Sequence, residues 1–312
     1  MKPHVLQTGP LSPSLDAALK THFNIHPLWK EADPASFLAG HGVCIEGIAS
    51  SAPVGASTEL IAALPALKVI SCRGVGLDKI DLAAAQTRGI AVSGTFGVLT
   101  DCVADLAFGL VIDVARRLSA ADRFVREGRW LKEKYPMTRR VSGKRLGIVG
   151  LGQIGRAIAK RAGGFDMEVR YHNRSAAADA PYGYEPSLEA LAGWADFLVV
   201  AVAGGASTRH LISREVLQAL GPDGFLINVA RGSVVDEDAL VAALTDRSIA
   251  GAGLDVYADE PRVPEALLAL DNVVLLPHMA SGTIETRTDM EDLVMANLKA
   301  FFDTGKVLTP AF

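Results

Sequence analysis

Short runs of aliphatic and β-branched residues alternate with helical periodicities along the first third of the chain. The apolar runs are residues 5–7, 42–45, 67–71 and 90–92, and a segment with apolar positions every three or four residues follows each run. Strands that alternate with helices favour parallel sheets with right-handed crossovers. Residues 1–97 are therefore predicted to form most of a small α/β domain with four strands.

Two amphipathic helices are predicted to cross between this domain and a second one. Residues 100–117 carry an apolar stripe through Val103, Ala107 and Val114, and a more charged continuation is expected over residues 120–130. The other helix covers residues 285–302 and is expected to return to the first domain. The predicted boundaries are thus residues 1–97 plus 286–312 for one domain and residues 98–285 for the other.

The second domain repeats the alternation of strand and helix. Its apolar runs begin at residue 146 and continue at residues 167–171, 197–202, 224–229, 249–256 and 273–276. Such runs are typical of parallel strands that are covered on both faces. The predicted fold class is therefore α/β, with two Rossmann-like or flavodoxin-like domains that each contain a parallel sheet.

Three glycines follow the first strand of the second domain directly. Gly150, Gly152 and Gly155 have the G-x-G-x-x-G spacing, and Gln153 and Ile154 lie between the last two. In a dinucleotide-binding unit these glycines permit the tight turn, the approach of a pyrophosphate and the close packing of helix on strand. An ordinary α/β turn can use the same glycines. The strand before them and the helix-forming residues after them favour a pyrophosphate site at the helix N-terminus.

Composition excludes several other classes of protein. Of the 312 residues, 49% are hydrophobic and 21% are charged, which argues against disorder. A net charge of −4 provides no basic field for nucleic acid or an anionic membrane. No apolar run approaches the length of a membrane span, and we expect a cytoplasmic protein. Cys44, Cys72 and Cys102 lack metal-ligand spacing, so they are predicted to be reduced thiols, and no metal is expected.

The end of the second strand of this domain indicates which dinucleotide binds. NAD sites place a carboxylate about 20 residues after the glycines, where it accepts a hydrogen bond from the ribose 2′-hydroxyl. This chain has Asn173, Arg174 and Ser175 there and no acid. An arginine can grip a 2′-phosphate, which a carboxylate would repel. The sequence therefore predicts NADPH in preference to NADH, with a solvated surface arginine and looser specificity as the alternative.

Three polar residues follow apolar strands in the second half of the chain, where ligands bind in open α/β sheets. They are Arg231, Glu260 and His278. Taken singly, each could be a capping arginine, a surface acid in a turn or a buried histidine with its hydrogen bonds satisfied. Together they supply an anion clamp, an acid and a proton donor, which these separate explanations do not account for.

These motifs resemble those of the D-2-hydroxyacid dehydrogenase family, and most of all its glyoxylate/hydroxypyruvate reductases. The resemblance spans most of the chain, and the motifs occur in the family's order: residues 75–81, 97–101, 150–155, 228–232, 253–256 and 277–281. It implies two α/β domains joined by the crossing helices, with the active site in the cleft between the domains. It also implies a homodimer built through the nucleotide domain, without nucleic-acid or membrane partners.

The resemblance assigns the catalytic roles residue by residue. Arg231 matches the arginine that grips the substrate carboxylate and polarises the C2 carbonyl. His278 matches the general acid that protonates the carbonyl oxygen, and Glu260 matches its carboxylate partner. Formate dehydrogenases of the same family carry Gln at the position of Glu260, which speaks against formate. Val75 and Gly76 match the loop whose backbone N–H groups hold the substrate carboxylate.

Further residues match contacts to the cofactor. Ala230 and Asp255 match contacts to the nicotinamide carboxamide, and Thr208 matches a contact to the ribose and phosphate. The remaining positions expected at the cofactor are Thr100, Gln153, Ile154, Val202 and Ser281. The loop at residues 203–209 departs from the family, which usually has a proline and an acid before the threonine. The sequence therefore leaves undecided how the loop at residues 203–209 contacts the cofactor.

The leading hypothesis is an NADPH-dependent reductase that converts glyoxylate or hydroxypyruvate to the D-2-hydroxy acid, with His278 as the general acid. One alternative is another D-2-hydroxyacid dehydrogenase, of the D-lactate or D-3-phosphoglycerate type. A different class is a dinucleotide-sensing protein like the corepressors that share this fold. The sequence leaves open which keto acid is used, because positions near Arg73, Leu77, Trp130 and Met279 set the tolerance for the substrate side chain.

Overall fold

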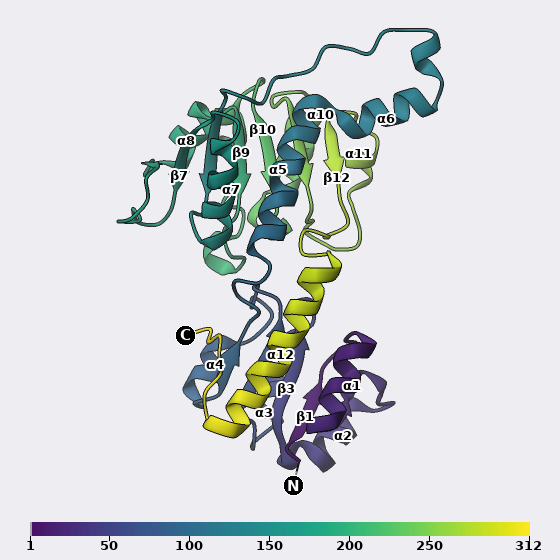
Figure 1. Ribbon diagram of the computed structural model, residues 1–312, viewed down its shortest axis with the longest axis vertical. Helices are drawn as coiled ribbons and strands as arrows, with labels where there is room; N and C mark the ends of the chain where they lie inside the picture. The colour runs from purple at the N-terminus through teal and green to yellow at the C-terminus, as the bar shows by residue number, and fades with distance from the viewer. Residues whose placement is uncertain (1) are drawn as a thin grey trace. The chain divides into compact units, whose positions relative to one another are not determined.

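A computed structural model describes residues 2–312 and divides the chain into two compact units. The first unit ends at Leu99 and resumes at Thr283, and the second covers Thr100–Gly282. Both units contain a parallel sheet covered by helices, which confirms the prediction of two α/β domains. Figure 1 shows both chain ends in the first unit.

The first unit contains a sheet of five parallel strands in the order β2-β1-β3-β4-β5. The strands are β1 (His4–Gln7), β2 (Asn24–Pro27), β3 (Ile45–Ser51), β4 (Val69–Arg73) and β5 (Ala91–Ser93). The helices are α1 (Pro13–His22), α2 (Pro34–His41), α3 (Thr58–Ala62), α4 (Leu82–Thr87) and α12 (Ile284–Thr304). Buried residues of α1 and α12, such as Leu19 and Leu298, pack with Val5 and Val69 on one face of this sheet.

Two sequence predictions for the first unit are wrong in detail. The strand expected at residues 42–45 begins only at Ile45, because Gly42–Cys44 forms a 3-10 turn. The strand β2 was not predicted, so the sheet has five strands and not four. Its residues Asn24–Pro27 are at most half-buried at the sheet edge and contain no apolar run, so neither hydrophobic signal of a strand is present.

The last residues of the chain close the other edge of this sheet. Pro310 forms an antiparallel bridge with Ser93 of β5, and the N–H of Ala311 donates to the carbonyl of Val92 at 2.8 Å. Asn297 of α12 is fully buried, and its Oδ1 accepts from the N–H groups of Leu308 and Thr309. The C-terminal segment is therefore fastened along β5.

The second unit contains seven parallel strands in the order β12-β11-β10-β9-β6-β7-β8. The strands are β6 (Arg145–Val149), β7 (Glu168–His172), β8 (Gly183–Tyr184), β9 (Phe197–Val200), β10 (Phe225–Asn228), β11 (Gly251–Leu254) and β12 (Val273–Leu275). The helices are α5 (Thr100–Arg116), α6 (Leu118–Arg126), α7 (Gln153–Gly163), α8 (Leu188–Trp194), α9 (Arg214–Leu220), α10 (Glu237–Thr245) and α11 (Glu265–Leu268). Figure 1 shows α5 and α7 in front of this sheet, and α8, α9 and α10 contribute buried residues to a core on its other side.

The continuous helix expected beyond residue 117 is interrupted. Arg117 has φ 54°, a left-handed conformation that cannot propagate an α-helix, and α6 starts at the next residue. Asp113 holds the break, since its carboxylate accepts hydrogen bonds from the N–H and the hydroxyl of Ser119. The helix therefore turns here and does not extend to residue 130.

Candidate active site

Three neighbouring strands of the second unit end beside one another with polar residues in their loops. Arg231 follows β10 by three residues, Asp255 follows β11 directly, and His278 follows β12 by three residues. Because β10, β11 and β12 are adjacent and parallel, their carboxyl ends meet at one edge of the sheet. This edge is where open α/β sheets bind ligands.

His278 and Glu260 form a close pair at this edge. Nδ1 of His278 donates to Oε2 of Glu260 at 2.7 Å, and the two side chains are 40% and 34% exposed. The other carboxylate oxygen, Oε1, accepts from the backbone N–H of Tyr257 at 3.1 Å. The acid is thus held from two sides, and the remaining ring nitrogen of His278, Nε2, stays available for a reacting group.

The environment of Glu260 keeps this residue ionised. Burial alone would raise its pKa, but the hydrogen bond and charge of His278 outweigh burial, helped by the N–H of Tyr257 and the charge of Arg231. The pKa of Glu260 therefore lies below its ordinary value. An ionised carboxylate favours a protonated imidazole beside it, which is the form that a general acid requires.

Asp255 holds the backbone on the C-terminal side of His278. Its fully buried carboxylate accepts from the N–H of Met279 at 2.8 Å and from the N–H of Ala280 at 2.9 Å. Burial raises the pKa of Asp255, and these two N–H groups oppose that rise. His278 itself has φ 50°, a left-handed conformation that costs a non-glycine residue about 1 kcal/mol or more. The hydrogen bonds to Asp255 help to maintain this conformation.

Two glycines allow the loop of Arg231 to approach its neighbours. A Cβ on Gly232 would lie 1.9 Å from the carbonyl carbon of Tyr257, so only glycine lets this loop contact the turn that carries Glu260. A Cβ on Gly204 would lie 2.6 Å from Cγ of Arg231. Gly204 belongs to the loop that departs from the family pattern, and in this chain that loop provides space for the side chain of Arg231.

The glycine loop after β6 has three distinct backbone environments. Gly150 has φ 100°, and a Cβ there would lie 2.7 Å from Cγ1 of Val202. A Cβ on Gly155 would lie 2.1 Å from the carbonyl oxygen of Gly150. Beside Gly152 a Cβ would meet nothing within 4 Å, and no side chain caps the N-terminus of α7. Open space beside uncapped N–H groups, which begin at Gln153 and Ile154, fits a pyrophosphate.

Asn173 and Arg174 follow β7 next to this loop. Oδ1 of Asn173 accepts from the N–H of Leu151 at 2.8 Å, which ties the glycine loop to the end of β7 and leaves Nδ2 as the donor of that side chain. Arg174 and Ser175 are exposed, and Arg174 pairs with no carboxylate among residues 2–312. A guanidinium in this position can bind an added anion without first breaking an ion pair.

The other predicted cofactor residues are distributed around the second unit. Thr100 is the first residue of α5, and the hydroxyl of Thr208 donates to the carbonyl of Ala203 at 2.7 Å, closing the loop. The N–H of Ala230 donates to Asn228, and Ser281 lies in the loop after His278. Val75 and Gly76 belong to the first unit, in the loop after β4, so their contact with a substrate carboxylate stays a prediction.

Tyr257 and Gly204 are structurally important positions that are not among the predicted site residues. Tyr257 is 6% exposed, and its hydroxyl donates to the carbonyl of Leu276 at 2.9 Å. The sequence does offer one signal for Tyr257: it follows the buried strand β11 closely, and a buried tyrosine hydroxyl requires a hydrogen-bond partner. No sequence pattern identifies Gly204, because its contact with Arg231 joins two loops of different strands.

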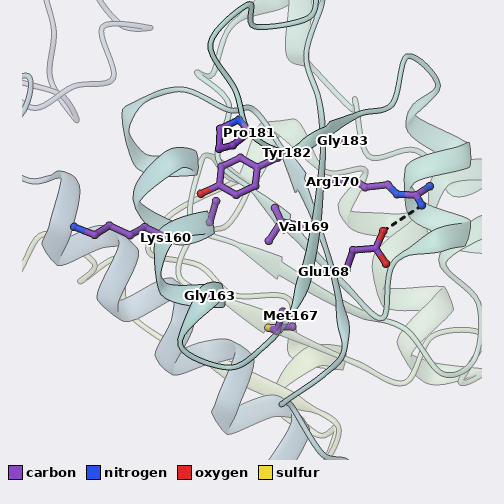
Figure 2. Close-up of a pocket in the computed structure, with 10 residues that line it drawn as sticks. Lys160, Gly163, Met167, Glu168, Val169, Arg170, Pro181, Tyr182 and Gly183 are labelled. Atoms are coloured by element: carbon purple, nitrogen blue, oxygen red, sulfur yellow. Dashed lines mark hydrogen bonds and ion pairs between the residues drawn. The ribbon is translucent and has the colours of Figure 1, made fainter.

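A cavity of about 540 Å³ lies elsewhere in the second unit. Figure 2 shows that residues from the last turn of α7, the start of β7 and the segment before β8 line it, Lys160, Val169 and Tyr182 among them. Two of its lining residues, Arg170 and Glu168, pair at 3.2 Å, and Arg170 also stacks over Trp194, which lies outside the lining. The last turn of α7 is the end opposite to the glycine loop, and none of the predicted site residues lines this cavity.

Among residues 2–312 no group of three or more histidine, cysteine or acidic side chains is arranged to hold a metal ion. No helix in this part of the chain combines the length and the apolar character that crossing a membrane requires.

Comparison with known proteins assigns the chain to a family. Residues 108–280 match the family of the D-isomer specific 2-hydroxyacid dehydrogenase, NAD binding domain. Glyoxylate/hydroxypyruvate reductase A of Arabidopsis thaliana and hydroxyphenylpyruvate reductase of Plectranthus scutellarioides are each 46% identical to this chain over 306 residues, with 98% of both chains covered.

A solved structure gives the same assignment. The NADPH-dependent glyoxylate/hydroxypyruvate reductase of Sinorhizobium meliloti, in complex with NADP and malonate, is 42% identical and superposes with a TM-score of 0.92. The match covers 100% of this chain and 97% of that one. The family match, the relatives and this structure agree with one another. The chain is an oxidoreductase that belongs to the D-isomer specific 2-hydroxyacid dehydrogenase family.

Proposed function

We propose that this protein reduces small 2-keto acids, glyoxylate and hydroxypyruvate first among them, to D-2-hydroxy acids with NADPH. The observation that carries the proposal is the 2.7 Å hydrogen bond between His278 and Glu260, at the same sheet edge as Arg231. A carboxylate-held imidazole next to an arginine suits a substrate with a carboxylate and a carbonyl on adjacent carbons. Relatives named for glyoxylate and hydroxypyruvate support this substrate class.

The residues of the chain have separate tasks in this reaction. Reduced nicotinamide supplies the hydride when it is bound. Nδ1–H of His278 donates to Glu260, so the proton that His278 gives to the substrate oxygen is the second one, which the imidazolium carries on Nε2. Arg231 binds the substrate carboxylate and stabilises the negative charge that develops on the oxygen. Glu260 stays ionised and stabilises the protonated imidazole.

The substrate range separates this proposal from other members of the family. A panel of glyoxylate, hydroxypyruvate, pyruvate and hydroxyphenylpyruvate at fixed NADPH is expected to give the highest kcat/KM for the first two. The inclusion of hydroxyphenylpyruvate matters because a 46% identical relative is named for it. If the aromatic keto acid gives the highest kcat/KM, the proposed substrate class is wrong. If none of the four keto acids is turned over, the proposed activity is wrong.

The preference for NADPH is proposed to rest on Arg174, with Asn173 and Ser175 as neighbouring donors. The guanidinium of Arg174 at the end of β7 is exposed and has no carboxylate partner in the part of the chain that the structure describes, which supports this assignment. A charge-assisted hydrogen bond contributes about 1.5–3 kcal/mol, which corresponds to roughly 10- to 100-fold in kcat/KM. Arg174→Ala is expected to lower kcat/KM for NADPH by this factor and to leave that for NADH nearly unchanged. A wild-type enzyme that prefers NADH would overturn the assignment.

The protein is further proposed to form a homodimer through its second unit. Figure 1 shows α6 and the following segment extending from the rest of that unit. Leu131 on this segment is 92% exposed, and Trp130 beside it is 69% exposed. A groove of about 480 Å³, lined by Met137 and Leu268 among others, lies on the same unit. The groove is lined by charged as well as apolar side chains, so the exposed side chains of Trp130 and Leu131 are the main support for a second copy of the chain as the partner.

The oligomeric state tests this last proposal. Light scattering after size-exclusion chromatography is expected to give twice the mass of the chain for the wild type. Replacing both exposed residues, as in Trp130→Lys/Leu131→Lys, is expected to give the mass of one chain, because two charges would have to be buried at the interface. A wild-type protein with the mass of a single chain at micromolar concentration would contradict the proposal.

A further inference from the structure

Tyr257 connects the two halves of the His278–Glu260 pair. Its backbone N–H donates to Oε1 of Glu260 at 3.1 Å, and its side-chain hydroxyl donates to the carbonyl of Leu276 at 2.9 Å. Leu276 follows β12 directly and lies two residues before His278. One residue therefore holds the acid through its backbone and the loop of the histidine through its side chain.

The hydroxyl of Tyr257 is well suited to a permanent structural contact. The side chain is buried, and burial together with the charge of Asp255 raises the pKa of Tyr257 to about 12. The hydroxyl therefore stays protonated and can donate at any pH at which the enzyme is used. Its distance to the carbonyl of Leu254 is longer, at 3.4 Å, so the carbonyl of Leu276 is its main acceptor.

The contact complements the hydrogen bonds on the other side of His278. Asp255 holds the N–H groups of Met279 and Ala280, which follow the histidine. The hydroxyl of Tyr257 holds the carbonyl of Leu276, which precedes it. His278 has a left-handed backbone that is unfavourable for a residue with a Cβ, so a loop fastened at only one end could relax away from this conformation. Relaxation would carry the imidazole away from Glu260.

We propose that the hydroxyl of Tyr257 positions His278 against Glu260, so that Tyr257 sets the efficiency of proton donation without contacting substrate or cofactor. This inference rests on the proposed role of His278 as the general acid. Tyr257 is a positioning residue, because its hydroxyl bonds to a backbone carbonyl and its aromatic ring is buried. A phenylalanine would fill the same volume and remove only the hydrogen bond.

The test is Tyr257→Phe, with Tyr135→Phe as the matched control. The hydroxyl of Tyr135 donates to the carbonyl of Arg117 at 3.0 Å in the same unit, so the control removes the same kind of hydrogen bond far from residue 278 in the sequence. Tyr257→Phe is expected to lower kcat for keto-acid reduction about tenfold, because small misplacements of a catalytic group are costly, and to leave both KM values within about twofold. Tyr135→Phe is expected to retain wild-type kcat.

Two further readouts distinguish positioning from a loss of stability. In Tyr257→Phe the pH profile of kcat is expected to differ from that of the wild type, because the hydrogen bond between His278 and Glu260 is disturbed. In the background of Glu260→Gln, Tyr257→Phe is expected to lower kcat by less than about twofold, since the pair that it positions is already broken. A purely structural role would lower the fraction of folded protein and leave the pH profile unchanged.

The outcomes separate this inference from the proposed function. Wild-type kcat together with an unchanged pH profile in Tyr257→Phe would overturn the positioning role. So would a double variant in which Tyr257→Phe lowers the kcat of Glu260→Gln by a further factor of about ten. Undiminished turnover in His278→Gln would overturn the proposed function instead. If Tyr257→Phe is too unstable to assay, ¹⁵N-histidine NMR spectra of its folded fraction provide the test. A His278 titration curve that is the same as in the wild type would count against the positioning role.

Discussion

Two histidine pairs with almost the same hydrogen-bond length lie in the two units and differ in their partners. In the first unit, Nδ1 of His4 lies 2.8 Å from Nε2 of His26, and the two rings are stacked. In the second unit, Nδ1 of His278 lies 2.7 Å from a carboxylate oxygen of Glu260. Two imidazoles can share one proton between them, whereas an imidazole and a carboxylate are most strongly bound when both are charged.

The comparison shows that the charge of the partner, and not the contact distance, decides which charge state the surroundings of a histidine favour. Burial lowers the pKa of His26, and the charges of His4 and His41 lower it further, while Glu31 opposes them. His26 is therefore suited to remain neutral. In the other pair the pKa of Glu260 is the one that is lowered, which preserves a negative charge beside His278. The second arrangement keeps an anion beside the imidazole, and the first does not.

The largest expected difference between the pairs is in catalysis. His278→Gln is expected to lower kcat for keto-acid reduction by roughly 10²- to 10⁴-fold, the usual contribution of a general acid. His26→Gln is the matched variant and is expected to retain wild-type kcat. Steady-state kinetics of both folded variants measures the contrast. An equal loss in the two variants would remove the functional distinction between the pairs.

The next largest effect is expected from the glycine that packs against the turn of Glu260. Gly232→Ala places a Cβ 1.9 Å from the carbonyl carbon of Tyr257, so the backbone must shift, and we expect a loss of about 1–3 kcal/mol in the free energy of unfolding together with a lower kcat. Gly109→Ala is the control, because a Cβ in the middle of α5 meets nothing within 4 Å and alanine favours a helix. Urea unfolding measures the change in unfolding free energy, which is expected to be a loss for Gly232→Ala and a gain for Gly109→Ala. A gain for Gly232→Ala would show that residue 232 does not lie close to Tyr257.

A smaller effect is expected in the pH dependence of stability from the first pair. Because the pKa of His26 is lowered in the folded state, the neutral ring contributes stability above its ordinary value of 6.5, and this stability is lost as the pH falls below that value. Relative to His26→Gln, the wild type is expected to lose unfolding free energy between pH 7.5 and pH 5.5, by less than about 1 kcal/mol. A difference that stays constant over this range would contradict the assignment.

The smallest effect is expected from Glu260 at acid pH. Its pKa is lowered in the folded state, so the carboxylate contributes stability above the ordinary value of 4.5 and loses it as the pH falls through the folded-state pKa. The stability difference between wild type and Glu260→Gln is expected to shrink on moving from pH 7 to pH 3. Unfolding curves at the two pH values measure it. A difference that grows toward acid pH would mean that the carboxylate is not ionised in the native pair.

The alternating pattern of the chain predicted most of the fold, because buried parallel strands such as Phe197–Val200 are continuous apolar runs. It failed for the edge strand Asn24–Pro27, which is only half-buried at most, and for the two-residue strand Gly183–Tyr184. The interruption at Arg117 also escaped prediction, since nothing in an arginine indicates a left-handed backbone. Local patterns thus specify central strands better than edges and breaks.

The candidate site was predictable to the extent that its residues follow strands directly. Arg231 and His278 stand out as polar residues after apolar runs, and the glycine spacing is visible along the chain. The contacts of Tyr257 with Leu276 and of Gly204 with Arg231 join segments that are separated in sequence, so only the folded chain shows them. Sequence patterns therefore indicate candidate reacting groups more readily than the residues that hold them in place.

The closure of the sheet in the first unit has a consequence for the handling of the protein. An open sheet edge is a template on which other chains can add strands and aggregate. Pro310 and Ala311 occupy the edge of β5, and Pro27, which lacks an N–H, ends the opposite edge strand. An affinity tag attached after Phe312 leaves this pairing in place. Proteolytic trimming of residues 309–312 is expected to expose the edge of β5 to intermolecular pairing.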